Sequence, residues 1–229
     1  MPEIPLFDDA GINLADPSDA KGHKTEYISK LQIEAIRRLL GPVSGVAADV
    51  GCGYGRMCRS LQTLGFSKVI GVDPSARVIE AARAISPEIE FRVGALPDLP
   101  IVTGEVGTIF LLNVLRALHL MGMSSVASGA GKSLPAGGRL VVLDNLRRGH
   151  PAYLAEEELI RLFEDSGLKL VKRESIRGAR LPWVPLLRFG LVPRRWHGAL
   201  LSFELEWMRR RPVAPRWQYI NVVWVFEKP

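Results

Sequence analysis

The chain has 229 residues, 47% of them hydrophobic, which is enough for one α/β domain with a full core but short for two independent domains. It has no apolar run of about 18 residues, and residues 1–13 lack the basic-then-apolar order of a secretory leader. These absences argue against a membrane-spanning or secreted protein, and we expect a cytoplasmic one. The net charge of +6 comes from one segment, because residues 177–217 hold nine arginines and two acids.

Residues 1–24 are rich in Asp, Pro and Gly, a composition that predicts an N-terminal arm or lid. From Thr25 onward we expect a single domain that extends to residue 229. Its first element is a helix, which ends at Gly41 and Pro42. Apolar residues recur along one face of this helix at Ile28, Leu31, Ala35 and Leu39.

Apolar strands then alternate with helical patterns. The expected strands are residues 46–50, 68–72, 90–93, 108–112, 139–143, 168–174 and 219–226. The expected helices between them are residues 56–64, 75–85, 115–134 and 155–166. Such alternation predicts βαβ units in a parallel sheet with helices on both faces.

One segment breaks this alternation. Residues 177–218 are far too many for a tight turn and hold four of the five tryptophans. Within it, Leu200, Phe203 and Trp207 have the spacing of one helix face, which we expect to pack on the core. The segment is predicted to be a helical cap, inserted before the last strand, over the active-site edge of the sheet.

The turn between the first strand and the first helix after it carries Gly51, Gly53 and Gly55. In a doubly wound sheet ligands bind beyond the carboxyl ends of the strands, where this turn lies. Glycines allow the backbone to approach a ligand closely and to offer it N–H groups, and the helix N-terminus adds a positive dipole end. The turn therefore predicts a nucleotide-type site, although NAD enzymes also use glycine-rich turns.

Three features disfavour a dinucleotide. The third glycine of the dinucleotide fingerprint is absent, because Arg56 directly follows Gly55. Asp49 precedes the first glycine, where it would repel a pyrophosphate and attract an ammonium group. Asp73 ends the second strand, where a carboxylate can accept hydrogen bonds from both hydroxyls of a ribose.

Residues 49–55 and 71–75 resemble the first and second motifs of the class I S-adenosylmethionine-dependent methyltransferases, and the resemblance runs from about Thr25 to the C-terminus. It implies a Rossmann-like, doubly wound, seven-stranded sheet whose last strand is antiparallel, and S-adenosylmethionine as cofactor. It also implies that Asp49 braces the glycine loop near the methionine moiety and that Asp73 binds ribose. The cofactor-binding residues expected on this basis are Asp49, Gly51, Cys52, Gly53, Gly55, Asp73, Pro74, Ala95, Leu96, Asn113 and Val114.

The sequence departs from the family pattern in two places. Many relatives carry an Asp after the third strand that contacts the adenine amino group, but Gly94 is followed by Ala95 and Leu96 here. Adenine would then be held by backbone groups and apolar contacts. After the fourth strand, Asn113 and Val114 match the segment that lines the methionine end, while Arg116 stands where a His is common.

A hydroxyl acceptor usually needs a general base. The catalytic candidates are His150, His119 and Tyr27, and His23 is a further possibility. We favour His150 because loops at strand ends carry the chemistry in this fold. Each of these residues could equally be a surface or capping residue.

We expect no metal ion. Asp144 and Asn145 resemble the magnesium-binding pair of catechol-type O-methyltransferases, and oxygen ligands suit that ion. The third acidic ligand is missing, however, because Asn113 stands at its position. A capping role for Asp144 is the alternative. The two cysteines, Cys52 and Cys58, have no nearby partners for a metal site and are expected to be structural.

The basic segment could bind nucleic acid, because it interleaves Arg with Trp. Nucleic acid is nevertheless disfavoured, since the Asn/Asp-Pro-Pro-aromatic sequence of amino-methylating enzymes and any added RNA-binding module are absent. Arginines also suit a small anionic acceptor, which we favour together with O-methylation over N- or C-methylation. The open alternatives are a membrane-associated lipid or glycan, with contact between the cap and the membrane surface, and a non-catalytic binding module.

Overall fold

The computed structural model describes residues 19, 22–115, 117–118, 122–146, 155–178, 181–210 and 220–229. The helices and strands of these residues are α1 (His23–Leu40), β1 (Val46–Val50), α2 (Arg56–Gln62), β2 (Lys68–Asp73), α3 (Ala76–Ile85), β3 (Glu90–Val93), β4 (Thr108–Leu112), α5 (Met123–Ser133), β5 (Arg139–Leu146), α6 (Glu156–Glu164), β6 (Lys169–Arg177), α7 (Trp183–Arg188), α8 (Arg194–Arg210) and β7 (Ile220–Glu227).

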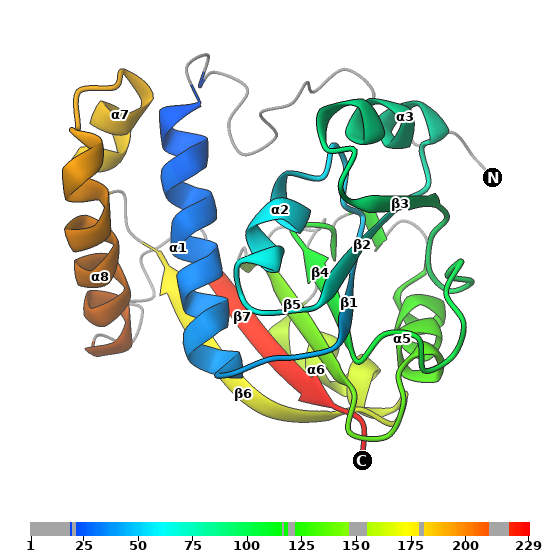
Figure 1. Ribbon diagram of the computed structural model, residues 1–229. Coiled ribbons are helices and arrows are strands. Elements are labelled where there is room, and N and C mark those ends of the chain that lie inside the picture. The colour runs from blue at the N-terminus through cyan, green and yellow to red at the C-terminus, as the bar shows by residue number, and fades with distance from the viewer. Residues whose placement is uncertain are drawn as a thin grey trace.

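All seven strands form one sheet with the order β3-β2-β1-β4-β5-β7-β6 (Figure 1). The strands β1 to β5 run parallel, whereas β7 pairs antiparallel with both β5 and β6. The order reverses between β1 and β4, which is where doubly wound sheets bind ligands. The expected Rossmann-like, seven-stranded fold with an antiparallel last strand is therefore confirmed.

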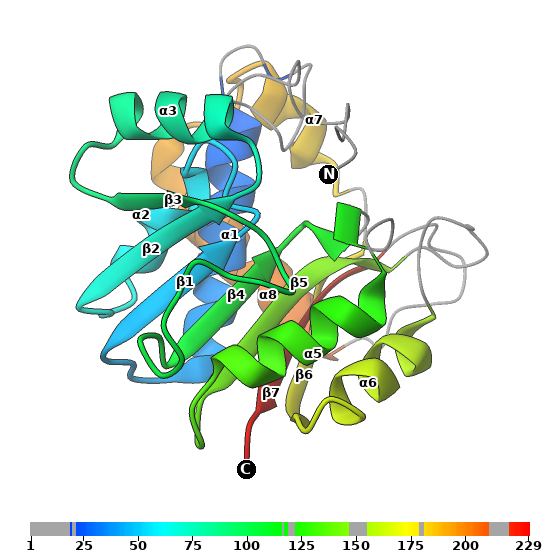
Figure 2. The same cartoon turned by 90° about the vertical axis from the view of Figure 1, so that its right-hand side faces the viewer.

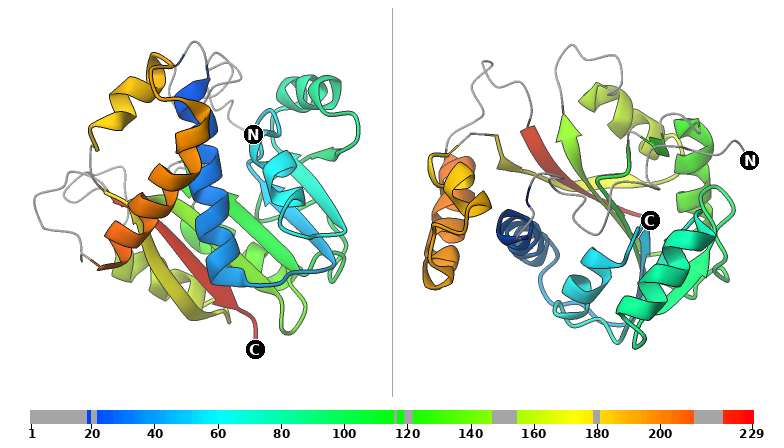
Figure 3. Two further views of the ribbon diagram at one scale, coloured as in Figure 1. Left: turned by 60° about the vertical axis from the view of Figure 1, so that its left-hand side comes forward. Right: turned by 90° about the horizontal axis from the view of Figure 1, so that it is seen from above.

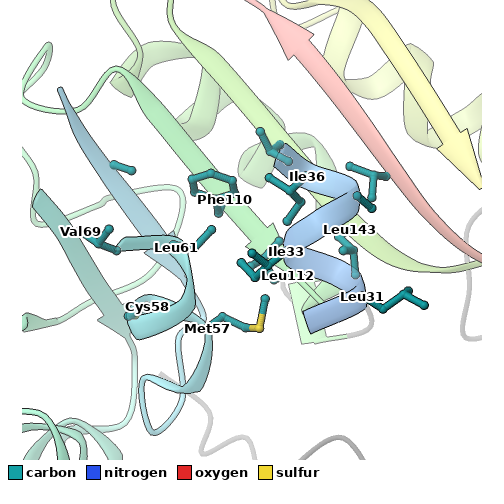
Figure 4. Packing of buried hydrophobic residues seen from close by; sticks show 14 of the residues in the cluster. Leu31, Ile33, Ile36, Met57, Cys58, Leu61, Val69, Phe110, Leu112 and Leu143 are labelled. Atoms are coloured by element: carbon teal, nitrogen blue, oxygen red, sulfur yellow. The ribbon is translucent and has the colours of Figure 1, made fainter. Parts of the chain in front are cut away.

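Helices cover both faces of the sheet (Figure 2). One core cluster joins the strands to α1, α2, α3 and α8, and a second joins them to α5 and α6. Figure 4 shows part of the first cluster, where side chains of α1 lie near those of α2, β4 and β5. The residues labelled there are Leu31, Ile33, Ile36, Met57, Cys58, Leu61, Val69, Phe110, Leu112 and Leu143.

Local sequence explains both ends of α1 and the start of α3. The carboxylate of Asp19 accepts a hydrogen bond from the backbone N–H of Thr25 at 2.7 Å, close to the start of α1. The α1 helix ends at Gly41, whose φ of 67° is easily adopted by a glycine. The hydroxyl of Ser75 caps α3 by accepting from the N–H of Val78.

The expected helix over residues 115–134 is wrong as one continuous element. The α5 helix spans Met123–Ser133 and begins after Gly122, which has a φ of 92°. A positive φ cannot be part of a right-handed helix, so this glycine separates α5 from the short helical stretch that begins at Leu115. That stretch remains close to the carboxyl end of β4.

The long segment before β7 forms α7 and α8, which lie as an outer layer beside α1 (Figure 3). The prediction of which face of α8 is buried was wrong, because Phe203 is 50% and Trp207 36% exposed and Leu200 is only partly buried. A neighbouring face is buried instead, formed by His197, Leu201, Glu204, Leu205 and Met208. Two of its five residues are polar, so hydrophobic periodicity alone favours the aromatic face.

Within the part of the chain that the structure describes, no helix has the length and apolar character needed to cross a membrane. Both cysteines are free thiols with buried side chains.

Candidate functional site

The glycine loop joins β1 to α2 through a backbone path that suits only glycine. Gly51, Gly53 and Gly55 have φ angles of 79°, 53° and 73°, in the left-handed region that side chains with a Cβ disfavour. A Cβ on Gly51 would lie 2.4 Å from Cγ1 of Val114. The loop is therefore packed directly against the segment that follows β4.

The loop's N–H groups are mostly used within the protein. The amides of Gly51 and Cys52 donate to the carbonyl of Val72 at 2.7 and 3.1 Å, and the amide of Gly55 donates to the carbonyl of Cys52 at 3.0 Å. The sequence suggested that the glycines offer these N–H groups to a ligand. For these residues the contribution is instead a tight turn that brings the backbone close to the site.

Asp73, at the carboxyl end of β2, joins the loop to the next helix. Its Oδ2 accepts a hydrogen bond from the N–H of Gly53 at 2.9 Å, and its Oδ1 accepts from the N–H of Ser75 at 3.0 Å. The carboxylate thus holds the glycine loop and the start of α3 in fixed positions relative to β2. Asp73 thus braces the glycine loop, while the role that the resemblance implies for Asp49 stays a prediction.

Asp49 lies beneath the loop and is only 2% exposed. Burial raises the pKa of its carboxyl group to about 6, although a hydrogen bond from Cys58 and the charge of Arg56 oppose the shift. The Cys58 thiol lies 3.3 Å from Oδ2 of Asp49. The neighbouring Cys52 thiol and burial keep the pKa of Cys58 well above its usual value, so this thiol stays neutral.

The stretch after β3 forms an apolar wall beside Asp73. The side chains of Ala95 and Leu96 are buried, whereas Pro74 is exposed. The N–H of Gly94 donates to the carbonyl of Asp73 at 3.0 Å, which holds the start of this wall against β2. This arrangement brings the residues expected to contact adenine next to the one expected to bind ribose.

The stretch after β4 turns sharply at Asn113, which has a φ of 60° and donates its N–H to the carbonyl of Leu143 at 2.7 Å. Asp144, which is buried at the end of β5, accepts from the N–H groups of Leu115 at 2.8 Å and Asn145 at 2.7 Å. Burial raises the pKa of Asp144 to about 6 against these two hydrogen bonds. Asp144 thus positions the segment that contacts the glycine loop. In the sequence, an acidic residue at the end of a predicted strand is the feature that indicates such a role.

Both carboxylate oxygens of Asp144 are therefore engaged with backbone, in agreement with the capping alternative. Among the described residues, no group of three or more His, Cys, Asp or Glu side chains is placed to hold a metal ion.

The expected catalytic residues are not brought together by the described structure. His119 and His150 lie outside the described residues, as does Arg116. The hydroxyl of Tyr27 is buried, donates to Glu204 at 2.8 Å and accepts from the indole N–H of Trp183 at 3.3 Å. Burial and the charge of Glu204 raise the pKa of Tyr27, which opposes its use as a base. His23 lies at the start of α1, beside Gly190.

The hydroxyl of Tyr27 belongs to a buried polar cluster between α1, β6, α7 and α8. In this cluster Nε of Arg177 lies 3.3 Å from Oε1 of Glu204, an ion pair without the alignment of a hydrogen bond. His197 packs edge-on against Tyr27, with ring centroids 5.7 Å apart. Sequence reasoning missed this cluster, because its members are up to 177 positions apart.

Comparisons with known proteins bear on both the fold and the site. Residues 47–138 match the family model described as a methyltransferase domain. A comparison with curated protein sequences gives no match. Solved structures resemble the chain in fold at low sequence identity.

Three of these structures illustrate the likeness. A geranyl diphosphate methyltransferase in complex with SAM is 19% identical, with a TM-score of 0.63 and coverage of 95% of this chain and 94% of that one. A geranyl diphosphate C-methyltransferase from Streptomyces coelicolor is 18% identical, with a TM-score of 0.66 and coverage of 91% and 84%. A TehB-like SAM-dependent methyltransferase from Corynebacterium glutamicum is 20% identical, with a TM-score of 0.58 and coverage of 91% and 100%.

The matched domain starts within β1 and includes the glycine loop, Asp73 and the segment after β4. The sheet order and the antiparallel last strand agree with the fold that the resemblance implied. Residues 47–138 therefore form a methyltransferase domain, and the fold of the chain is similar to that of solved S-adenosylmethionine-dependent methyltransferases.

Proposed function

We propose that this enzyme methylates a small-molecule acceptor and holds its cofactor between the glycine loop, Asp73 and the segment after β4. The main supporting observation is the Asp73 carboxylate, which accepts hydrogen bonds from the N–H groups of Gly53 and Ser75 at the carboxyl edge of the sheet. A ribose with two adjacent hydroxyls suits such a carboxylate.

The surrounding residues fit the remaining parts of the cofactor. Ala95 and Leu96, whose side chains are buried, would border adenine chiefly through their backbone groups, and Asp49 offers a negative charge to the methionine ammonium group. Val114 lies against Gly51, so the glycine loop and the segment after β4 together border the methionine end. We assign Cys52, Gly53, Gly55, Pro74 and Asn113 to the same site as its framework.

When bound, the cofactor would supply a methyl group on a positively charged sulfonium; an acceptor atom would bond to that methyl carbon in line as the sulfur leaves as a neutral thioether. The protein's own task is to align the acceptor with that methyl group and to exclude water. Asp144 contributes by fixing Leu115, and through it the turn at Asn113. A base for a hydroxyl acceptor would come from the stretches after β4 and β5, where His119 and His150 are the candidates.

We favour a small anionic acceptor, with O-methylation ahead of N- and C-methylation. Arginines dominate the segment inserted before β7, and arginine binds carboxylates and phosphates in a bidentate manner. The geranyl diphosphate enzymes of similar fold act on a small anionic molecule by their names, which supports this class of acceptor. A lipid or glycan acceptor at a membrane is the second candidate, favoured by exposed aromatic side chains on α8.

Calorimetry with S-adenosylmethionine tests the cofactor site. We expect saturable binding to the wild-type protein and a roughly hundredfold weaker affinity in Asp73→Ala, because two charge-assisted hydrogen bonds to ribose are lost. The matched control is Asp165→Ala, an exposed carboxylate at the end of α6, which should bind as wild type does. Absence of binding to the folded wild-type protein would contradict the proposal.

Transfer itself is tested with a labelled methyl group and fractionated small-molecule extracts. We expect label in a fraction of low molecular mass. Treatment of the labelled product with mild base then distinguishes a methyl ether, which resists the treatment, from a methyl ester, which is cleaved. Cofactor binding with no transfer to any fraction would favour the non-catalytic binding module instead.

A further inference from the structure

The described part of the chain concentrates its exposed aromatic residues in one place. Its four exposed Phe and Trp side chains all belong to the segment that contains α7 and α8, and two exposed leucines accompany them. These six residues, here called the aromatic face, are Leu186, Phe189, Leu191, Trp196, Phe203 and Trp207. Soluble surfaces rarely gather large apolar side chains in this way without a binding role.

The first half of the aromatic face is the turn that ends α7. Phe189 and Leu191 are 61% and 66% exposed. The turn is nevertheless well formed, because the N–H of Leu191 donates to the carbonyl of Leu186 at 3.0 Å and the N–H of Gly190 donates to the carbonyl of Leu187 at 2.9 Å. It therefore presents its apolar side chains from a fixed backbone and not from a loose loop.

The second half lies along α8. Trp196, Phe203 and Trp207 are separated by seven and four positions, which places them on one side of the helix, next to the buried face. The rings of Phe203 and Trp207 lie 5.7 Å apart, and Trp183 of α7 packs against Phe203 at 5.9 Å. These contacts orient the rings while leaving much of their surface exposed.

Positive charge surrounds the aromatic face. Residues 181–210 hold five arginines and two glutamates, and one of the glutamates, Glu204, is buried beside Arg177. Arg194, Arg209 and Arg210 are largely exposed, although each has an ion pair with Glu26 or Glu206. The guanidinium group of Arg195 lies 5.9 Å from the ring centroid of Trp196.

We infer that the aromatic face docks on an anionic lipid bilayer, with the side chains of α7 and α8 entering the interface and the arginines contacting lipid phosphates. Exposed Trp and Phe beside Arg are the side chains that favour the boundary between headgroups and acyl chains. The charge complementarity with anionic lipids favours this occupant over a second copy of the chain, whose positive charge would be repelled. The aliphatic Leu186 and Leu191 have no stacking role on nucleic-acid bases.

This inference concerns where the enzyme sits and does not depend on the identity of its acceptor. Figure 1 places α7 at the same end of the molecule as the start of α1, and His23 at that start lies beside Gly190 in the α7 turn. No helix of the described residues could cross a membrane, so the contact would be peripheral. Docking would hold the carboxyl edge of the sheet close to the lipid surface.

Co-sedimentation of the full chain with vesicles tests the inference. Phosphatidylcholine vesicles that contain phosphatidylglycerol should pellet the protein at low salt, whereas phosphatidylcholine alone should not, and high salt should release it. The double variant F189S/L191S should bind the anionic vesicles at least about tenfold more weakly than the wild-type protein, because two apolar side chains no longer enter the interface. The variant R194Q/R195Q should bind the same vesicles about tenfold more weakly, because two positive charges are removed.

The matched control is Val102→Ser, which removes an even more exposed apolar side chain from the loop before β4 and should leave vesicle binding unchanged. Calorimetry with S-adenosylmethionine on each variant should show wild-type affinity, which separates loss of docking from loss of fold or of the cofactor site. Failure to pellet with anionic vesicles at low salt would overturn the inference. The inference would also be overturned if F189S/L191S abolished dimer formation or RNA binding of the wild-type protein but left its vesicle binding unchanged.

Discussion

Two regions of the molecule are built in opposite ways. At the glycine loop, function depends on backbone: three positive φ angles, a carboxylate that accepts two N–H groups, and no room for a Cβ at Gly51. Around α7 and α8, the structure depends on side chains that meet from distant parts of the chain, such as Tyr27 and Glu204. The first region lies in the part of the chain that matches a methyltransferase domain, and the second is where we expect the acceptor and the location of the protein to be decided.

The α1 helix connects the two regions. On one side, the hydroxyl of Ser29 accepts a hydrogen bond from the guanidinium group of Arg56, at the start of α2. On the other side, Tyr27 donates to Glu204 of α8. The comparison therefore predicts that changes in the glycine loop alter cofactor binding with the fold intact, while changes in the buried cluster alter stability with cofactor affinity intact.

The largest expected effect is that of Gly51→Ala. Its Cβ would lie 2.4 Å from Val114, so the loop or the segment after β4 must move, and we expect cofactor affinity to fall by about a hundredfold or more. The matched control is Gly45→Ala, which has a similar φ of 75° and nothing within 4 Å of the added Cβ. Calorimetry should give Gly45→Ala the affinity of the wild-type protein, and a wild-type affinity in Gly51→Ala would contradict the prediction.

The next effect is that of Glu204→Gln on unfolding. The change keeps an acceptor for Tyr27 but leaves the buried guanidinium of Arg177 without its negative partner, so we expect the free energy of unfolding to fall by about 3 kcal/mol. The double variant Arg177→Met/Glu204→Leu should recover most of this loss, because no charge then remains in the cluster.

Glu206→Gln is the control for Glu204→Gln, since its partner Arg210 is exposed and the expected change is within about 0.5 kcal/mol. Chemical denaturation measures all of these variants, and cofactor affinity should be close to that of wild type in each. A large loss of affinity in Glu204→Gln would mean that the buried cluster and the cofactor site are not separate.

The same contrast explains what the sequence could reveal. The glycine loop, Asp73 and the positions of the strands follow from local patterns, since a tight turn needs glycine within a few residues and a short apolar run marks a buried strand. The antiparallel last strand was implied only by the family resemblance. The buried face of α8 was predicted wrongly, because Glu204 is a charged residue that only its distant partners, Tyr27 and Arg177, make compatible with burial. No local pattern reports such a pairing.

The break at Gly122 was missed for a different reason. Glycine is tolerated within helices at a cost of about 1 kcal/mol, so its presence alone does not end one. The roles of Asp49 and Asp144 lie between these cases: their position at strand ends is visible in the sequence, whereas their burial and raised pKa values require the packed sheet.

The smallest expected effect is the pH dependence that Asp49 confers. Its pKa of about 6 means that it gains a proton as the pH falls below that value, which removes the charge that attracts the cofactor's ammonium group. We expect the Kd for S-adenosylmethionine to rise by up to about tenfold per pH unit below pH 6 in the wild-type protein. Asp144 titrates in the same range, so Asp49→Asn is needed as the reference, and it should bind weakly at every pH with a flatter profile.

Stability should move in the opposite direction. A carboxyl whose pKa is raised on folding binds its proton better in the folded chain than in the unfolded one between about pH 4 and 6, so its stabilising contribution is present at low pH and is lost as the pH rises through 6. Asp49→Asn should therefore have a free energy of unfolding roughly 2 kcal/mol above that of the wild-type protein at pH 7, measured by chemical denaturation, and this difference should disappear at pH 4. If Asp49→Asn were less stable than the wild-type protein and unaltered in cofactor affinity at pH 7, the buried carboxylate would serve the fold and not the cofactor site. The contrast between the two regions would then not hold for the glycine loop.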